Sequence, residues 1–182
     1  MADEKTPVQD LVEISSEPLS LGKYVDAVRD ARAGAIATFS GTTRNSFQGR
    51  VVMQLEYEAY ETMAIRQMHI ICAEARKRWP IIALACAHRV GIVPIGHESV
   101  IVAASSVHRA DALLACHFII DEIKASVPIW KKEIYADGEV WKENAEFFIN
   151  NSTSRRSGSA LHANKELDKR ADTEKNDLSH ET

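Results

Sequence analysis

Hydrophobic and polar positions change their spacing along the chain, and each spacing indicates a different element. Runs of apolar residues, or apolar residues at every second position, are typical of strands; a three- and four-residue spacing indicates helices. By this criterion we expect strands over 9–15, 35–40, 51–60, 81–90, 99–105 and 128–135. We expect helices from Ser20 to about Arg32, from the end of the 51–60 strand to about Trp79, and over 107–126. Interleaved helices and hairpin-like strand pairs predict an α+β fold, a single domain with long helices packed on a mainly antiparallel sheet.

Glycine and proline mark the ends of the predicted helices. Gly34 follows the first helix, and Pro80 follows the second. Pro128 disfavours the helical conformation at Val127, so we expect the chain to turn there before the last strand.

The composition changes near the end of the chain. Residues 152–182 contain no aromatic residue, no Val and no Ile, and their basic and acidic residues balance. Such a segment cannot bury enough apolar surface to offset its conformational entropy. We therefore expect 152–182 to be a solvated, disordered tail and 1–8 to be a shorter disordered end. The folded domain is expected to span 9–151.

The whole-chain composition excludes several classes of function. A length of 182 residues suits one domain with a sizeable core, and a net charge of −4 gives no overall footprint for nucleic acid. No apolar run is long enough to span a membrane, and the polar, acidic start MADEKTPVQD is not typical of a signal or transit peptide. Cys72, Cys86 and Cys116 form no CxxC motif, so we expect neither a zinc site nor disulfides, and a reduced, cytosolic protein.

The stretch KASVPIWKKE, residues 124–133, concentrates lysine beside proline and tryptophan. Lys124 lies about 60° from the middle of the apolar stripe of the preceding helix, so its stem can lie on apolar surface while its amine emerges at an edge. That stripe consists of Leu113, Cys116, Ile120, Ile123 and Val127.

After the turn at Pro128, strand alternation places Ile129 and Lys131 on one face and Trp130 and Lys132 on the other. Lys124 and Lys131 can therefore converge across one turn. The alternative is that both are ordinary solvated lysines.

The 107–126 helix begins with two cationic side chains, His108 and Arg109. A helix N-terminus has a positive dipole end and free N–H groups, so cations there are unfavourable unless an anion binds. The alternative is that Ser105 or Ser106 caps the helix and Asp111 compensates the charge.

Arg44 lies in GTTRN, directly after the predicted strand 35–40, where it is a candidate ligand for phosphate or carboxylate. By itself the motif could be any polar turn, and it is not a P-loop. No Ser-His-Asp pattern and no metal-ligand spacing is present, so we expect neither a metal nor a bound cofactor. Four other histidines lie in predicted helices, strands or loops and are more typical of structural residues than of ligands: His69, His88, His97 and His117.

Together, five stretches identify a family resemblance. Their order is GTTRN, LEYEAYETMA, HRVG, SSVHR and K-x-x-V-P-I-W-K-K-E, and it resembles the large, catalytic subunit of molybdopterin synthase over about residues 9–150. The resemblance implies that Lys124 and Lys131 match two active-site lysines. It implies that Arg44, His108 and Arg109 match residues that hold the anionic substrate, with the His-Arg pair able to reach the pocket of a neighbouring large subunit.

The resemblance also implies the reaction and the partners. The substrate is cyclic pyranopterin monophosphate, which receives two sulfurs and becomes the dithiolene of the molybdenum cofactor. Each sulfur arrives as a thiocarboxylate at the Gly-Gly C-terminus of a ubiquitin-like small subunit. The assembly is a heterotetramer built on a homodimer of large subunits, with no role for nucleic acid or a membrane.

Two other functions fit some of the same residues. A sulfurtransferase could carry sulfur as a persulfide on a cysteine, but all three cysteines lie in apolar surroundings that favour inert thiols. A non-catalytic module could use the lysines only to bind an anion or a partner.

Overall fold

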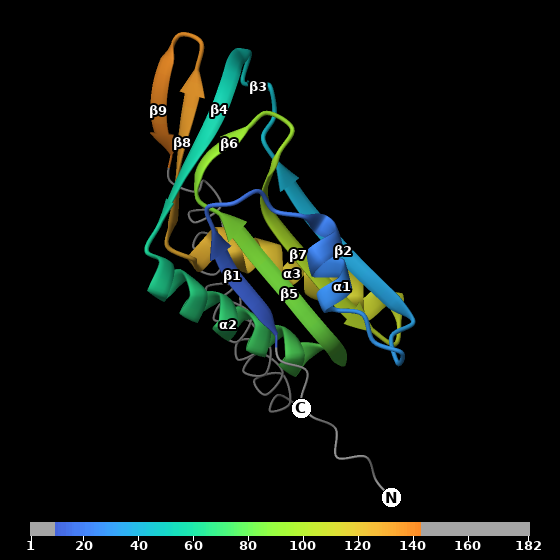
Figure 1. Ribbon diagram of the computed structural model, residues 1–182. Helices are drawn as coiled ribbons and strands as arrows, with labels where there is room; N and C mark the ends of the chain where they lie inside the picture. The colour runs from blue at the N-terminus through green and yellow to red at the C-terminus, as the bar shows by residue number, and fades with distance from the viewer. Residues whose placement is uncertain (1–9, 143–182) are drawn as a thin grey trace, which may run out of the picture. The chain divides into compact units, whose positions relative to one another are not determined.

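The computed structural model describes residues 10–142, which belong to one compact unit. The predicted ends 1–8 and 152–182, and residues 143–151, lie outside the described part. The helices are α1 (Leu21–Ala27), α2 (Glu61–Arg78) and α3 (Arg109–Ser126). The strands are β1 (Leu11–Ser15), β2 (Ala35–Thr42), β3 (Ser46–Phe47), β4 (Arg50–Ala59), β5 (Ile81–Arg89), β6 (Gly91–Pro94), β7 (Glu98–Ser106), β8 (Ile129–Tyr135) and β9 (Gly138–Lys142) (Figure 1).

The first sheet has the strand order β1-β5-β7-β2, with β1 parallel to β5 and the other pairs antiparallel. Alternate residues of β5 and β7 face opposite layers. Leu84, Cys86 and Val102 pack with α2 and α3, whereas Ala85 and Ile101 pack with α1. Since helices cover both faces, these two strands are apolar nearly throughout, which explains their continuous hydrophobic pattern (Figure 1).

The second sheet is antiparallel and has the order β3-β4-β8-β9, with β6 also paired to β4. The chain enters this sheet from α3 through the turn at Val127, whose backbone is extended (φ −79°, ψ 131°), as expected before Pro128. In the register of β4 and β8, Tyr57 lies opposite Lys131 and Leu55 lies opposite Glu133.

The predicted α+β class, with two long helices on mainly antiparallel sheet, is confirmed. Two sheets are present rather than one, and the short strands β3, β6 and β9 were not predicted. The first helix ends at Ala27 rather than near Arg32. The Asp30 carboxylate accepts hydrogen bonds from the Arg32 backbone amide (2.8 Å) and guanidinium, which stabilises a turn in place of another helical turn.

At the start of α3, the alternative of a serine cap and the expected burial of Leu113 are both wrong. Ser105 and Ser106 do not cap the helix but are buried in β7; the Ser105 hydroxyl accepts from the Ala83 amide (3.1 Å) and the Ser106 hydroxyl donates to the Pro80 carbonyl (3.0 Å). Leu113 is 59% exposed, because α3 approaches the sheet through the small residues Ala112 and Ala115 instead.

No helix within residues 10–142 is long and apolar enough to cross a membrane.

Gly34 is required by a close backbone approach between β2 and the start of α3. Its amide donates to the Ser106 carbonyl (3.1 Å), and a Cβ at this position would lie 2.4 Å from the Val107 carbonyl oxygen. Gly34→Ala should therefore lower the free energy of unfolding by about 1–3 kcal/mol, measured by urea denaturation.

Gly22→Ala is the matched control. A Cβ there would meet nothing nearer than 3.8 Å, and Gly22 is inside α1, so this change should raise stability by about 0.5–1 kcal/mol. Equal effects of the two substitutions would contradict the steric argument.

Candidate active site

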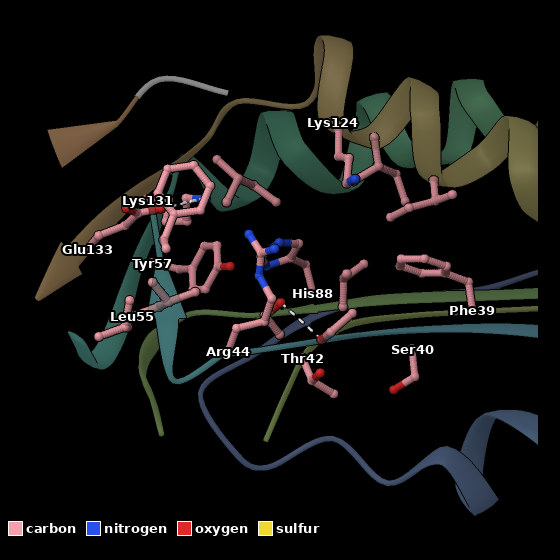
Figure 2. Close-up of a pocket in the computed structure, with 18 of the residues that line it drawn as sticks. Phe39, Ser40, Thr42, Arg44, Leu55, Tyr57, His88, Lys124, Lys131 and Glu133 are labelled. Atoms are coloured by element: carbon pink, nitrogen blue, oxygen red, sulfur yellow. Dashed lines mark hydrogen bonds and ion pairs between the residues drawn. The ribbon is translucent and has the colours of Figure 1, made fainter. Parts of the chain in front are cut away.

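A cavity of about 410 Å³ lies between the two sheets and the C-terminal end of α3 (Figure 2). About half of the lining residues are apolar, and the wall comes from β2, β3, β4, β5, β7, β8 and the last turns of α3. The apolar lining residues include Phe39, Phe47, Val52, Leu55, Ile120, Ile123, Val127 and Ile129. Apolar surface beside the polar groups lowers the local dielectric and so strengthens electrostatic interactions made in the cavity.

The two lysines at the centre of the sequence argument both line this cavity. Lys124 is in the last turn of α3, where a cation also complements the negative end of the helix dipole. Lys131 is on β8, three residues after Pro128. The extended turn at Val127 lets two ammonium groups seven positions apart reach one cavity, as the alternation predicted.

Lys131 is held by a buried carboxylate. Its Nζ lies 3.1 Å from Oε1 of Glu133, which is 4% exposed, and the Tyr135 hydroxyl donates to the other carboxylate oxygen. The three side chains occupy every second position of β8 and so lie on one face of the strand. Lys132 lies on the other face, where its Nζ is 2.8 Å from Glu139 and lies over the ring of Trp141.

Arg44 reaches the cavity from the opposite wall, on a loop anchored by its neighbour Thr43. The buried Thr43 amide donates to the His97 carbonyl (3.1 Å), and its hydroxyl donates to the Val93 carbonyl (3.3 Å). The Arg44 guanidinium lies 5.3 Å from the ring centroid of Phe47 and forms no ion pair with any residue between 10 and 142. Figure 2 shows Arg44 and Lys124 extending into the cavity from opposite sides. A guanidinium without a carboxylate partner is available to an anionic ligand.

Tyr57 and His88 add neutral polar groups to the wall. The two rings meet edge to face, with centroids 4.9 Å apart. Nδ1 of His88 lies 2.9 Å from the Arg89 carbonyl oxygen. Burial lowers the pKa of His88 to about 4, so the imidazole is neutral at pH 7. Burial also raises the pKa of Tyr57, which keeps its phenol protonated. His88 is thus buried and bonded on one side, as expected of a structural histidine, yet it also lines the cavity.

His108 and Arg109 do not join this cavity within one chain. They are exposed at the first turn of α3, whereas Lys124 is in its last turn. Fifteen residues of α-helix separate Arg109 from Lys124, a rise of about 22 Å. The structure therefore groups Arg44, Lys124 and Lys131, and leaves the His-Arg pair at the far end of the helix.

The cysteines lie outside the cavity. Cys72 on α2 and Cys86 on β5 are buried with their Sγ atoms 3.7 Å apart, and Cys116 is buried on α3. The contact with Cys72 and burial raise the pKa of Cys86, and burial raises the pKa of Cys116 to about 11. Neutral, enclosed thiols are poor sulfur carriers. In the described part of the chain, no group of three His, Cys, Asp or Glu side chains is placed to hold a metal ion.

With this geometry established, comparison with known proteins decides the family. The family model described as MoaE protein matches residues 14–126, more than half of the chain. The chain belongs to the MoaE family. Its activity is that of the catalytic subunit of molybdopterin synthase, an enzyme of molybdenum cofactor biosynthesis.

Relatives across kingdoms support the same assignment. The molybdopterin synthase catalytic subunit of Oryza sativa subsp. indica is 57% identical over 163 residues, covering 84% of both chains. The human catalytic subunit is 46% identical over 140 residues, covering 77% of this chain and 74% of the relative. The crystal structure of molybdopterin synthase from Staphylococcus aureus is 39% identical, with a TM-score of 0.69, and covers 71% of this chain and 95% of that chain.

Sequence reasoning missed several polar residues of the cavity, among them Tyr57, His88 and Glu133. Glu133 could have been found, because it follows Lys131 by two positions and so shares its face of the strand. Tyr57 and His88 could not, since they lie on different sheets and their ring contact depends on how the two sheets meet.

The position of the cysteines predicts that none is needed for chemistry. Single Cys72→Ala, Cys86→Ala and Cys116→Ala variants should retain sulfur transfer in an assay of dithiolene product. Each should lose only about 1–2 kcal/mol of stability from the small cavity left behind. A variant that stays folded at the assay temperature but loses transfer would restore the cysteine persulfide mechanism.

Proposed function

We propose that the cavity binds cyclic pyranopterin monophosphate and that two sulfurs are transferred to it from thiocarboxylated small subunits, forming the dithiolene. The observation that carries the proposal is the grouping of Arg44, Lys124 and Lys131 around one cavity of about 410 Å³. Both the cyclic phosphate and the incoming thiocarboxylate are anions, and cations in a water-poor site bind such groups strongly.

The two lysines are suited to stabilise charge that develops during transfer. Attack of the thiocarboxylate sulfur on a pterin carbon forms a C–S bond and displaces an oxygen as water. A water molecule then adds to the acyl carbon, which creates an oxyanion there, and the acyl C–S bond breaks to leave a carboxylate on the small subunit. A nearby ammonium lowers the energy of both steps. Because the buried Glu133 carboxylate fixes the Lys131 ammonium in place, Lys131 is the better candidate for a positioned charge. Lys124, at the helix end, is then the candidate for proton movement.

The proposed sulfur donor is a ubiquitin-like small subunit whose Gly-Gly C-terminus enters the cavity. A structure from Helicobacter pylori that shares this fold, with a TM-score of 0.61 and 22% identity, is a complex of subunits 1 and 2 of molybdopterin-converting factor. A Gly-Gly tail has no side chains and can approach the lining closely. A cavity with cations in its wall suits such a tail, whose end carries the negative charge.

We further propose that two copies of this chain form the central homodimer of a heterotetramer. Three apolar side chains on and beside the first turns of α3 are exposed: Val107 by 51%, Leu113 by 59% and Leu114 by 51%. They accompany His108 and Arg109, which cannot reach the cavity of their own chain. A second copy covering this apolar surface would remove it from water and could receive the His-Arg pair in its own cavity.

We place this reaction in the cytosol. The support is that Cys72, Cys86 and Cys116 are all free thiols, as is usual in reducing compartments.

Lys124→Ala separates catalysis from docking. Product formation should fall by about 10²–10⁴-fold, because the group proposed to move protons is lost. The complex with the small subunit should still form by gel filtration. Lys132→Ala is the matched control, since Lys132 is on the other face of β8, and it should keep normal activity. Loss of the complex in Lys124→Ala would instead favour the non-catalytic binding module.

Arg44→Ala and Arg109→Ala test the substrate assignment. Each removes a charge-assisted hydrogen bond worth about 1.5–3 kcal/mol, so calorimetric titration should show pterin affinity about ten- to a hundredfold weaker. The defect should shrink at high salt, and affinity for the small subunit should change less. Arg29→Ala, which alters an exposed arginine paired with Asp26, should have no effect.

Mixing the two arginine variants shows whether one site uses two chains. If Arg109 acts in the neighbouring copy, a mixed dimer of Arg44→Ala and Arg109→Ala chains contains one site with both changes and one intact site. Activity should then rise above that of either variant alone. If both arginines act within one chain, every site keeps one defect and mixing should restore nothing.

A further inference from the structure

We propose that His88 contacts the substrate, with its Nε2 accepting a hydrogen bond from an N–H group of the reduced pterin ring. The inference rests on the proposed function, since it takes the pterin as the occupant of the cavity. It adds an uncharged residue to a site so far defined by cations.

The tautomer of His88 follows from its neighbour. A backbone carbonyl can only accept a hydrogen bond, so Nδ1, 2.9 Å from the Arg89 carbonyl oxygen, must carry the proton. In a neutral imidazole the other nitrogen, Nε2, then holds a lone pair. No residue within 10–142 donates to this atom. The side chain is 7% exposed and lines the cavity, so a donor for Nε2 can come from a ligand there.

The orientation of the ring is fixed from two sides. The hydrogen bond at Nδ1 holds one edge, and the edge-to-face contact with Tyr57 holds the plane. His88 is also inside β5, opposite Val100 of β7, which lines the same cavity. Figure 2 shows the imidazole on the same side of the cavity as Arg44 and Tyr57. A ring held in this way presents its lone pair in a constant direction.

The cavity needs an acceptor of this kind. Arg44, Lys124 and Lys131 can only donate. The Glu133 carboxylate has further lone pairs, but it is 4% exposed and is held by Lys131 and Tyr135. A reduced pterin has ring N–H and amino groups, and a buried donor left without an acceptor weakens binding. The hydroxyl groups of the wall can both donate and accept, so they do not distinguish a ligand edge that carries N–H donors from one that carries acceptors. Nε2 only accepts, and it therefore selects a ligand edge that carries N–H.

Substitution at His88 tests the contact. In His88→Phe, which keeps a planar ring but has no acceptor, calorimetric titration with cyclic pyranopterin monophosphate should show affinity about three- to tenfold weaker. His88→Gln can place an amide oxygen near the Nε2 position and should regain most of the loss. The control His69→Phe removes an exposed histidine from α2 and should bind like the wild type.

Nitrogen NMR on the unaltered protein avoids any question of folding. With ¹⁵N-labelled histidine, the Nε2 signal of His88 should shift when the pterin is added, and the signal of Nδ1 should move less. A shifted Nε2 signal together with rescue by His88→Gln supports the contact. If the pterin binds but the Nε2 signal does not move, or if His88→Phe and His88→Gln lose equal affinity, the His88 contact is wrong. The proposed function would still stand in either case. Absence of pterin binding by the wild type would overturn the proposed function and this inference with it.

Discussion

The burial of β5 and β7 on both faces is the constraint on which the rest of the structure depends. Alternate residues of these strands pack against α1 on one side and against α2 and α3 on the other. Many of them are alanines, as at Ala85 and Ala103, so the helices can lie close to the sheet. The position of α3 against this surface determines where its last turn ends, and hence where Lys124 meets the second sheet.

The cavity combines an apolar wall with charges that are unequally compensated. Lys131 has a buried carboxylate partner in Glu133, whereas the contact that Arg44 makes within residues 10–142 is with the face of the Phe47 ring. The two cations therefore suit different roles. The ammonium of Lys131 is held in place by its carboxylate partner, and the guanidinium of Arg44 is available to the anionic part of a ligand. His88 and Tyr57 remain neutral because they are buried, so they supply hydrogen bonds without adding charge.

Local patterns predicted most of the elements and the approach of Lys124 to Lys131. That approach depends on sequence over only eight residues, from the last helical turn through Pro128 into a strand. The short strands β3, β6 and β9 were missed because their pairing is decided by neighbours rather than by periodicity. Leu113 was assigned to the buried face because it is hydrophobic. In the structure the smaller residues Ala112 and Ala115 contact the sheet instead, and hydrophobicity alone does not favour them over a leucine. The role of His88 in the wall required the tertiary structure, since nothing in LACAHRVG distinguishes a packed imidazole from one that faces a ligand.

The alanine-rich surface of the central strands has a consequence for which substitutions natural selection can accept. Ala104 and Ala115 are fully buried in the core between the first sheet and α3, where close packing resists an added methyl group. A modest enlargement there can be absorbed by a slight displacement of the helix, at a cost that leaves the domain folded. The same displacement moves the ammonium of Lys124 relative to that of Lys131, and reactions depend steeply on such alignment. A larger residue at either alanine is therefore expected to lower the catalytic rate at a size that still leaves the domain folded.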